Sequence, residues 1–259
     1  MTHPDLSVYR IKDRGLVISV CSKIDIMSHY LDFYIENGVE EVSKEGFEEM
    51  KKLLAFCCAF TRFLPRDTIF SCNVSLPISK RKHFCVFDVG SKTFVARSHK
   101  WMPKEYDKSP RLAVQKASVS SDINSVSMVD CLDEPENDMI VNMLIDRYFE
   151  VHGGGLFRVF EGNSGFFVVS FLESDEESRE KLLDLIPADL EKTVELSEKA
   201  DKYFYEFKCG CDAQRMSSLF SVISKEDIDY LFENGDEISV DCPRCGLKYT
   251  FKRGDLEKN

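Results

Sequence analysis

Four cysteines near the end of the chain fall into two close pairs. Cys209 and Cys211 form a CxC motif, Cys242 and Cys245 form a CxxC motif, and thirty residues lie between the pairs. Cysteine thiolates are preferred zinc ligands, and two close pairs supply the four ligands of a closed tetrahedral site. Such a site has no open position for a substrate. The spacing therefore predicts one structural zinc ion held by these four residues.

The residues around the second pair agree with this prediction. Pro243 stiffens the turn, and Gly246 tolerates the positive φ that often follows a metal-binding cysteine. The alternative is four free or buried cysteines in a small helical domain. Unrelated cysteines seldom fall into two close pairs that bracket a domain-sized insert, so the pattern favours the metal site.

Short elements carry the two pairs. We expect a short helix over residues 215–223, a second helix that Ser224 and Asp227 begin as a capping box, and strands over 237–241 and 247–251. The side chains expected to face inward are Leu219, Ile223, Ile228, Leu231, Phe232, Leu247, Tyr249 and Phe251.

A domain of roughly fifty residues with so few apolar side chains usually needs a covalent or metal staple. Zinc binding is therefore expected to contribute to the folding free energy of residues 207–259.

The first 172 residues have a different pattern. We expect helices over 24–37, over a segment that Ser43 caps, and from about residue 135 to His152, where Gly153 ends the helix. The strands predicted from period-two patterns are 15–21, 68–76, 83–89, 92–97, 111–120, 125–131, 156–160 and 166–172. Because strands follow one another directly, we predict an α+β domain over 1–172 with a largely antiparallel sheet.

Residues 173–206 are strongly acidic and are expected to form a charged helical linker. Two helices are predicted, separated at Pro187, with the second spanning residues 188–203. Its apolar stripe is thin, and its local support comes from pairs such as Glu195 with Lys199. Such a helix is marginal without a docked partner. A solvated linker between domains is the alternative that periodicity alone favours.

Composition limits the possible functions. The chain has 259 residues, 43% hydrophobic and 12% aromatic, and a net charge of −11. That charge argues against nucleic acid as the main partner, and the basic run at residues 80–82 suits a solvated turn between strands. A membrane span needs an apolar run of about 20 residues, and the sequence contains none. The first residues are polar and lack a signal-peptide pattern.

We therefore expect a cytoplasmic protein with reduced thiols, whose partners are neither membranes nor nucleic acids. The other six cysteines fall inside apolar patterns and are expected to be small buried side chains: Cys21, Cys57, Cys58, Cys72, Cys85 and Cys131. The adjacent Cys57 and Cys58 both lie on the apolar side of the helix predicted after Ser43.

The C-terminal motifs resemble the zinc domain of the redox-regulated 33-kDa heat-shock chaperone family. The segments that carry the resemblance are 207–211 (FKCGC), 234–238 (NGDEI) and 242–251 (CPRCGLKYTF). The order of an α+β core, a charged helical linker and a cysteine module is also similar. Within the first 172 residues, three pairs are similar in position to features of the family: Arg14-Gly15, Leu53-Leu54 and Tyr148-Phe149.

This resemblance implies an ATP-independent holdase rather than an enzyme. In the reduced state the four cysteines would bind zinc. Peroxide or hypochlorite with mild unfolding would oxidise them, with disulfides within each pair, Cys209–Cys211 and Cys242–Cys245. The linker would then unfold, and the protein would dimerise and bind unfolded or misfolded client proteins under oxidative stress.

The residues themselves are compatible with such a switch. Thiolate is the form that oxidants attack, and a sulfenic acid at Cys242 or Cys245 has a resolving thiol within reach. A CxC disulfide closes a small strained ring, so it is easily reduced again. Linker unfolding would expose apolar residues among carboxylates, a surface that could hold a client. These residues are Leu182, Leu183, Leu185, Ile186, Leu190 and Val194.

Two other functions compete with this one. A zinc-ribbon module could bind a protein or nucleic acid without chaperone activity, although its acidic residues disfavour nucleic acid. A thiol–disulfide oxidoreductase could use Cys242 and Cys245, although such a CxxC is expected at a helix start near a βαβ unit. The five histidines show no ligand spacing, and His152 is expected only to end a helix.

Overall fold

The computed structural model describes most of the chain. The described residues are 6–11, 16–22, 25–39, 43–105, 107–131, 140–153, 155–163, 165–171, 177, 180, 184, 187–197, 199–233 and 235–256. Within them, no helix is long and apolar enough to cross a membrane.

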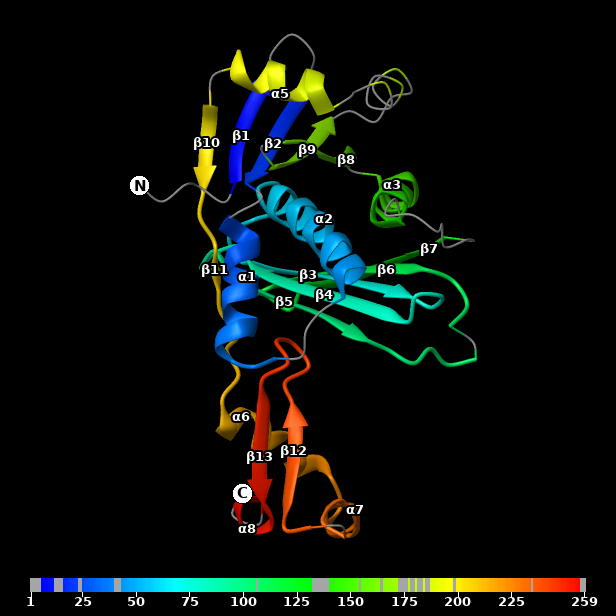
Figure 1. Cartoon of the computed structure of the whole chain (residues 1–259), viewed down its shortest axis with the longest axis vertical. Helices are drawn as coiled ribbons and strands as arrows, with labels where there is room; N and C mark the ends of the chain where they lie inside the picture. Colours follow the sequence, from blue (N-terminus) through cyan, green and yellow to red (C-terminus); the bar gives the residue numbers. More distant parts are fainter. Residues whose placement is uncertain are drawn as a thin grey trace.

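The first sheet, sheet A, joins strands from both ends of the core. Its order is β10-β1-β2-β9-β8, and all neighbours are antiparallel. The strands are β1 (Leu6–Ile11), β2 (Leu16–Ser22), β8 (Leu156–Glu161), β9 (Gly165–Phe171) and β10 (Lys199–Tyr203). Five separate segments of the chain therefore meet in this sheet (Figure 1).

The second sheet, sheet B, is mostly a meander of consecutive hairpins. Its order is β11-β5-β4-β3-β6-β7, antiparallel except where β11 runs parallel to β5. The strands are β3 (Thr68–Leu76), β4 (Arg81–Asp88), β5 (Thr93–Lys100), β6 (Arg111–Ser118), β7 (Asn124–Asp130) and β11 (Glu206–Phe207). The antiparallel α+β prediction is confirmed, with the strands divided between two sheets.

The helix α2 (Lys44–Thr61) lies between the two sheets and forms the centre of the core (Figure 1). Ser43 caps it as predicted, since its hydroxyl accepts a hydrogen bond from the Gly46 amide at 3.1 Å. From Leu53 to Thr61 every residue is buried, because sheets cover opposite sides of the helix. The apolar stripe read from the sequence is thus only part of its buried surface.

Two further helices complete the core. The helix α1 (Asp25–Glu36) packs near β2 and β11, and α3 (Ile140–His152) packs against β8, β7 and α2. Gly153 follows α3 with a φ of +68°, in agreement with the predicted helix end. The part of the predicted α3 before residue 140 lies outside the described residues.

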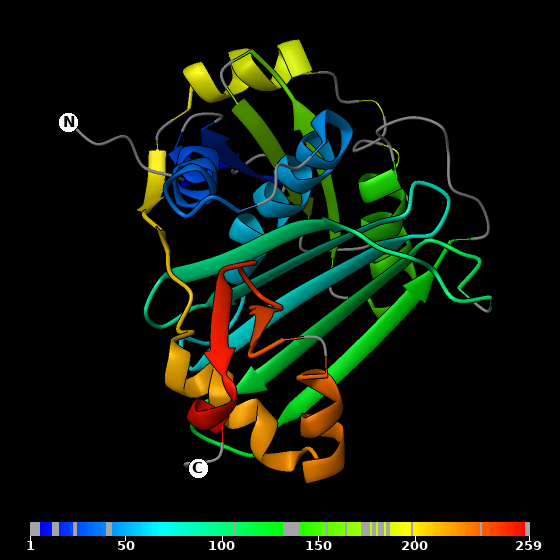
Figure 2. The same cartoon turned by 60° about the horizontal axis from the view of Figure 1, so that its bottom comes forward.

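The C-terminal module protrudes from the outer side of sheet B (Figures 1 and 2). Its elements are α6 (Ala213–Ser218), the 3-10 helix η2 (Leu219–Val222), α7 (Lys225–Leu231), the hairpin of β12 (Glu237–Asp241) and β13 (Lys248–Lys252), and α8 (Arg253–Leu256). The Ser224 hydroxyl accepts from the Asp227 amide at 3.2 Å, which confirms the predicted helix start.

The second predicted linker helix was too long. The helix α5 (Pro187–Glu195) ends before Leu196, and Lys199–Tyr203 is strand β10, so Glu195 and Lys199 do not form an i, i+4 pair on one helix. Tertiary pairing with β1 overrides the local charge pattern. The first predicted linker helix lies almost wholly outside the described residues.

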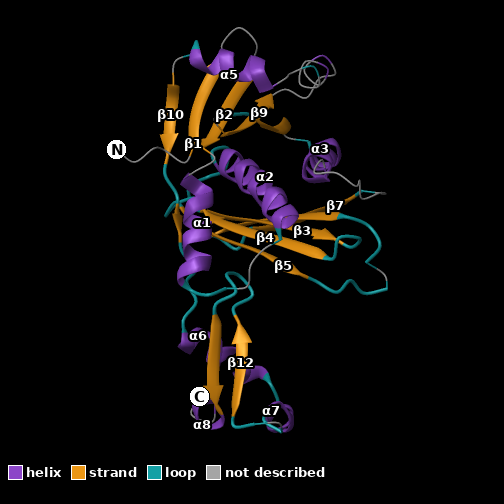
Figure 3. Cartoon of the chain, in the orientation of Figure 1, coloured by secondary structure: helices purple, strands orange, loops and turns teal. Residues whose placement is uncertain are grey.

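The end of the linker segment is also built into the core. Tyr205 is buried, and its hydroxyl lies 2.9 Å from Oγ1 of Thr61 and 3.2 Å from the Cys58 carbonyl oxygen. Strands β10 and β11 on either side of it belong to sheets A and B, respectively, and Figure 3 draws β10 as a strand and not as part of a helix. Residues 199–207 are therefore a structural part of the core and not a solvated linker, which corrects that alternative.

Candidate metal centre

The structure brings the four predicted cysteines together at the base of the C-terminal module. Their sulfur atoms all lie within 4.8 Å of one another, and Cys242 and Cys245 are buried. The Cys209 and Cys242 sulfurs are 3.8 Å apart, and the Cys211 and Cys245 sulfurs are 3.5 Å apart. Among the described residues, this is the one such group of potential metal ligands.

The arrangement fits a zinc ion. With Zn–S bonds of about 2.3 Å, the sulfurs of a tetrahedral site are separated by roughly 3.8 Å. The measured contacts match this separation and join one cysteine of each motif to one of the other. Cys209, Cys211, Cys242 and Cys245 are thus a suitable ligand set for a closed metal site, which leaves no position for a substrate.

The local electrostatics show why a cation belongs here. Hydrogen bonds from Cys209 and Cys245, together with the backbone amides of Cys245 and Arg244, hold the pKa of the Cys242 thiol well below its usual value. The hydrogen bond with Cys242 is the main reason that the pKa of Cys209 rises to about 12. One sulfur alone can ionise easily, and a central cation is needed to hold all four as thiolates.

Tyr249 extends the centre. Its hydroxyl donates a hydrogen bond to the sulfur of Cys211 at 3.1 Å. Such contacts to metal-ligating sulfurs orient the ligands and tune their charge. The period-two pattern predicts Tyr249 only as an inward residue of the last strand and gives no sign that its hydroxyl reaches a cysteine.

The turn that holds the second pair is tied to sheet B. Gly246 has a φ of +80°, as its predicted role requires, and a Cβ there would lie 2.8 Å from the side chain of Val39. Arg97, on β5, donates a hydrogen bond to the Cys242 carbonyl oxygen at 2.8 Å and lies 3.6 Å from the Asp241 carboxylate. The cysteine turn therefore contacts the core through Arg97, a residue that sequence patterns did not single out.

Aromatic contacts hold the segment that leads to the first cysteine pair, Cys209 and Cys211. Phe207 packs against Phe33 at 4.4 Å and Phe94 at 5.1 Å between ring centroids, two residues before Cys209. The next amide, of Lys208, donates to the Phe94 carbonyl oxygen at 2.8 Å. The CxC motif thus begins where β11 leaves the sheet.

The core of the module is small, as predicted, but its membership differs. Met216, Phe220, Cys242, Cys245 and Phe251 form one buried cluster with Val95 of sheet B, and Phe232 is also buried. Leu219 is 53% exposed, Leu231 is 43% exposed and Ile223 is 36% exposed, so the inward orientation predicted for these three residues is wrong. The chain forms a 3-10 turn at 219–222, which breaks the helical period assumed for Leu219.

Comparison with known proteins agrees with this geometry. Residues 168–252 match the family model described as Hsp33 protein. A 33 kDa chaperonin of Ruminiclostridium cellulolyticum is 30% identical over 93 residues, covering 36% of this chain and 30% of that protein. A 33 kDa chaperonin of Haemophilus influenzae is 41% identical over 69 residues, covering 26% and 22%.

A solved structure extends the likeness to the whole fold. The crystal structure of a 33 kDa chaperonin (heat shock protein 33 homolog) from Thermotoga maritima superposes with a TM-score of 0.70 at 13% identity, covering 99% of this chain and 97% of that one. At this identity the match shows the fold alone. The aligned parts span between about a fifth and two fifths of the curated relatives' length.

The fold and the four-cysteine cluster define an α+β protein with a C-terminal four-cysteine module. The three comparisons together confirm the resemblance to the Hsp33 family that the sequence predicts.

Proposed function

We propose that this protein is an ATP-independent chaperone of the holdase type, switched on by oxidation of its four-cysteine centre. The observation that carries the proposal is the convergence of Cys209, Cys211, Cys242 and Cys245, with their sulfurs within 4.8 Å, in a module that matches Hsp33. In the reduced state these residues hold one zinc ion. Its role is to staple the module and keep the sulfurs deprotonated.

Oxidation removes the ligand set. One molecule of peroxide takes two electrons from a pair of thiolates, so that one disulfide forms and the two peroxide oxygens leave as hydroxide. Two such reactions convert the four thiolates into the disulfides Cys209–Cys211 and Cys242–Cys245. A module with so few buried side chains then loses its staple and unfolds.

The helix α5 offers a way for this unfolding to reach a client-binding surface. Leu190 of α5 is buried on the outer face of sheet A against Ile18, Phe167 and Val169. Glu191 holds the helix by accepting a hydrogen bond from the Asn163 amide at 2.5 Å. Release of α5 would uncover this apolar face. Leu182, Leu183, Leu185 and Ile186, which were predicted to contribute to the exposed surface, lie outside the described residues.

The partners proposed are unfolded or misfolded proteins, with a second copy of the oxidised chain as a further partner. The net charge of −11 would keep a loaded complex soluble. A cytoplasmic location, in which the thiols stay reduced, remains a prediction from the sequence pattern. Nucleic acid, membranes and catalysis have no part in this proposal.

The oxidoreductase alternative is less well supported. Cys242 and Cys245 lie in the turn between β12 and β13 and not at a helix start. Their sulfurs also lie within 4.8 Å of the sulfurs of the other cysteine pair. An insulin-reduction assay tests it directly.

The test of the proposed function combines metal content, thiol count and aggregation of a client. Peroxide at about 40 °C should lower zinc from about one per chain to none, remove four thiols, and turn on suppression of client aggregation. Reduced protein is the control. Zinc loss without any suppression would overturn the holdase and leave only an oxidant sensor.

The variant Leu190→Ala tests whether α5 covers the binding face. Truncation of this buried leucine should cost about 2–3 kcal/mol of helix docking and give partial suppression of aggregation without oxidant. Leu196→Ala is the matched control, because Leu196 is 81% exposed. Equal behaviour of the two variants would contradict the role of α5.

A further inference from the structure

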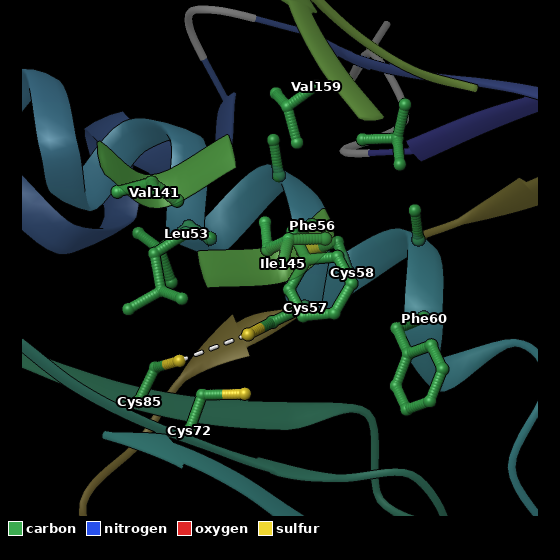
Figure 4. Packing of buried hydrophobic residues seen from close by; sticks show 14 of the residues in the cluster. Leu53, Phe56, Cys57, Cys58, Phe60, Cys72, Cys85, Val141, Ile145 and Val159 are labelled. Atoms are coloured by element: carbon green, nitrogen blue, oxygen red, sulfur yellow. Dashed lines mark hydrogen bonds between the residues drawn. The ribbon is translucent and has the colours of Figure 1, made fainter. Parts of the chain in front are cut away.

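A second group of thiols lies in the middle of the core, far along the chain from the C-terminal centre. Cys57 on α2 and Cys85 on β4 have their sulfurs 3.2 Å apart, and both side chains are fully buried (Figure 4). Cys72 on β3 pairs directly with Cys85 in the register of sheet B. Three cysteines from three elements thus converge at the contact between α2 and sheet B.

The sequence prediction that these cysteines are buried is correct, but their convergence was not foreseen. The adjacent pair in the sequence is Cys57 and Cys58, whereas the pair in space is Cys57 and Cys85. The β3–β4 hairpin was the available signal, since its register places residue 72 opposite residue 85. The approach of Cys57 depends on how α2 packs, which no local pattern encodes.

The arrangement suits redox chemistry. Within the described part of the chain, the four C-terminal cysteines are the one group gathered closely enough to hold a metal ion. The three core thiols do not form a metal site of this kind. Two sulfurs in contact on different elements are instead the starting geometry for a disulfide. Neither sulfur belongs to the centre already described.

The electrostatics distinguish the roles of the thiols. Burial raises the pKa of Cys57 and of Cys72. Burial opposes ionisation of Cys85 as well, but hydrogen bonds from Cys57 and Cys72 and the nearby His83 outweigh it and hold the pKa of Cys85 below its usual value. Cys85 is therefore the thiol of the three that ionises most easily, and thiolate is the reactive form.

We infer that Cys57 and Cys85 form a second oxidation site, at which a peroxide joins α2 to sheet B through a disulfide. The Cys85 thiolate attacks one peroxide oxygen, the O–O bond breaks, and Cys85 becomes a sulfenic acid. The departing hydroxide takes up the proton that the Cys85 thiol released, which gives one water. The Cys57 sulfur then attacks the Cys85 sulfur and the S–O bond breaks. The departing hydroxide takes up the Cys57 thiol proton and leaves as a second water. The two thiols lose two electrons, which the peroxide accepts. This inference is independent of the proposed chaperone function.

The site has a direct structural consequence. A disulfide here would close a chain segment between residues 28 positions apart and fasten the central helix to the sheet. Because the sulfurs are buried, the oxidant reaches them when α2 moves away from sheet B, so the reaction should accelerate on mild heating. The core would be locked by the conditions that release the C-terminal module.

Peptide mapping tests the site in the full-length chain. Trypsin separates the three thiols into peptides 53–62, 67–80 and 83–92, which contain Cys57 with Cys58, Cys72, and Cys85. After peroxide at about 40 °C, mass spectrometry should find 53–62 linked to 83–92. The melting temperature of the core should rise, and a reductant should return it to the starting value.

Two variants identify the cysteine involved. Cys57→Ala should abolish the link and the rise in melting temperature. Cys58→Ala is the matched control, since Cys58 is the next residue of α2 and equally buried, and it should retain both. Mapping of the wild-type chain needs neither variant, so poor folding of one of them leaves the test intact.

Three results would overturn the inference. The first is peptide 53–62 remaining unlinked once all four C-terminal thiols are oxidised. The second is a link that survives in Cys57→Ala. The third is linkage of 53–62 to 67–80, or to the peptides containing Cys21 and Cys131, as often as to 83–92, because this would indicate random exchange in an unfolded chain.

Discussion

The C-terminal module and the core differ in how much buried apolar surface stabilises them. The helix α2 of the core buries every residue from Leu53 to Thr61, whereas α7 of the module buries none of its described residues. Buried apolar surface contributes about 25 cal/mol per Å² to stability. Such burial can hold α2 in place but cannot hold α7. We therefore expect the module to depend on a metal ion at its four-cysteine cluster, so that removal of one ion unfolds it while the core persists. A switch is easiest to build where stability has a single removable source.

Metal removal tests this difference most severely. A strong chelator under reducing conditions should unfold residues 207–256 and leave the core folded, because structural zinc contributes an apparent 10–16 kcal/mol to such modules. Limited trypsin digestion should then cut at Lys208 and beyond while a core fragment survives. Readdition of zinc should restore protection, and a module that stays resistant after metal loss would remove the basis of the comparison.

A cavity in α2 should produce the opposite pattern. Leu53 is fully buried, so Leu53→Ala should destabilise the core by about 2–5 kcal/mol. Zinc content should stay unchanged, and the loss should appear as a lower denaturant midpoint of the core. Ile35→Ala is the control, because Ile35 is 77% exposed and should change the midpoint little. Zinc loss on Leu53→Ala would show that the two regions are not independent.

These two regions also differ in how far sequence reasoning could describe them. The cysteine spacing singled out the four residues whose sulfurs gather in the structure. Hydrophobic patterns located α2 and the hairpins of sheet B to within a few residues. Such features are encoded locally. Short runs of β-branched residues mark the strands, and capping residues mark the ends of the helices.

Features that depend on distant partners were missed. Strand β1 was not predicted, and residues 199–203 were assigned to a helix, since β1 pairs with both β2 and β10, and β10 is a strand through its pairing with β1. The contacts of Arg97, Tyr249 and Cys85 with residues far along the chain have the same origin. Local propensity yields to tertiary pairing at these positions.

Acid should affect the core through one buried carboxylate. Glu49 lies 2.8 Å from His83 Nε2 and 2.7 Å from a nitrogen of Arg81. Burial alone would raise the pKa of Glu49, but these hydrogen bonds outweigh it and hold the pKa below the ordinary value of 4.5.

Because the folded state has the lower pKa, this carboxylate stabilises the core above pH 4.5, and that contribution is lost as the pH falls below it. Glu49→Gln should cost roughly 1–3 kcal/mol at neutral pH and flatten the decline of the denaturant midpoint in acid. The neighbouring Glu48→Gln serves as the control. Parallel acid profiles for all three proteins would contradict the assignment.

The smallest expected effect concerns the contact between the two regions. Arg97→Ala removes the hydrogen bond to the Cys242 carbonyl oxygen and should cost about 1 kcal/mol. We expect zinc still to bind at one ion per chain, with a chelator removing it several-fold faster. Arg244→Ala changes an exposed arginine of the same turn and is the matched control. Identical release rates would show that the core does not steady the metal centre.

The pairing of β1 with β10 has a consequence for how the chain folds as it is made. Leu6 pairs with Tyr203, so sheet A gains its outer strand only after about three quarters of the chain has been synthesised. Sheet B, in contrast, is mainly a series of consecutive hairpins between residues 68 and 130 and can form early. Pairings of such long sequence separation are slow to form. The segment that closes sheet A is also the one that leads into the cysteine module, so the module emerges just as the core becomes complete.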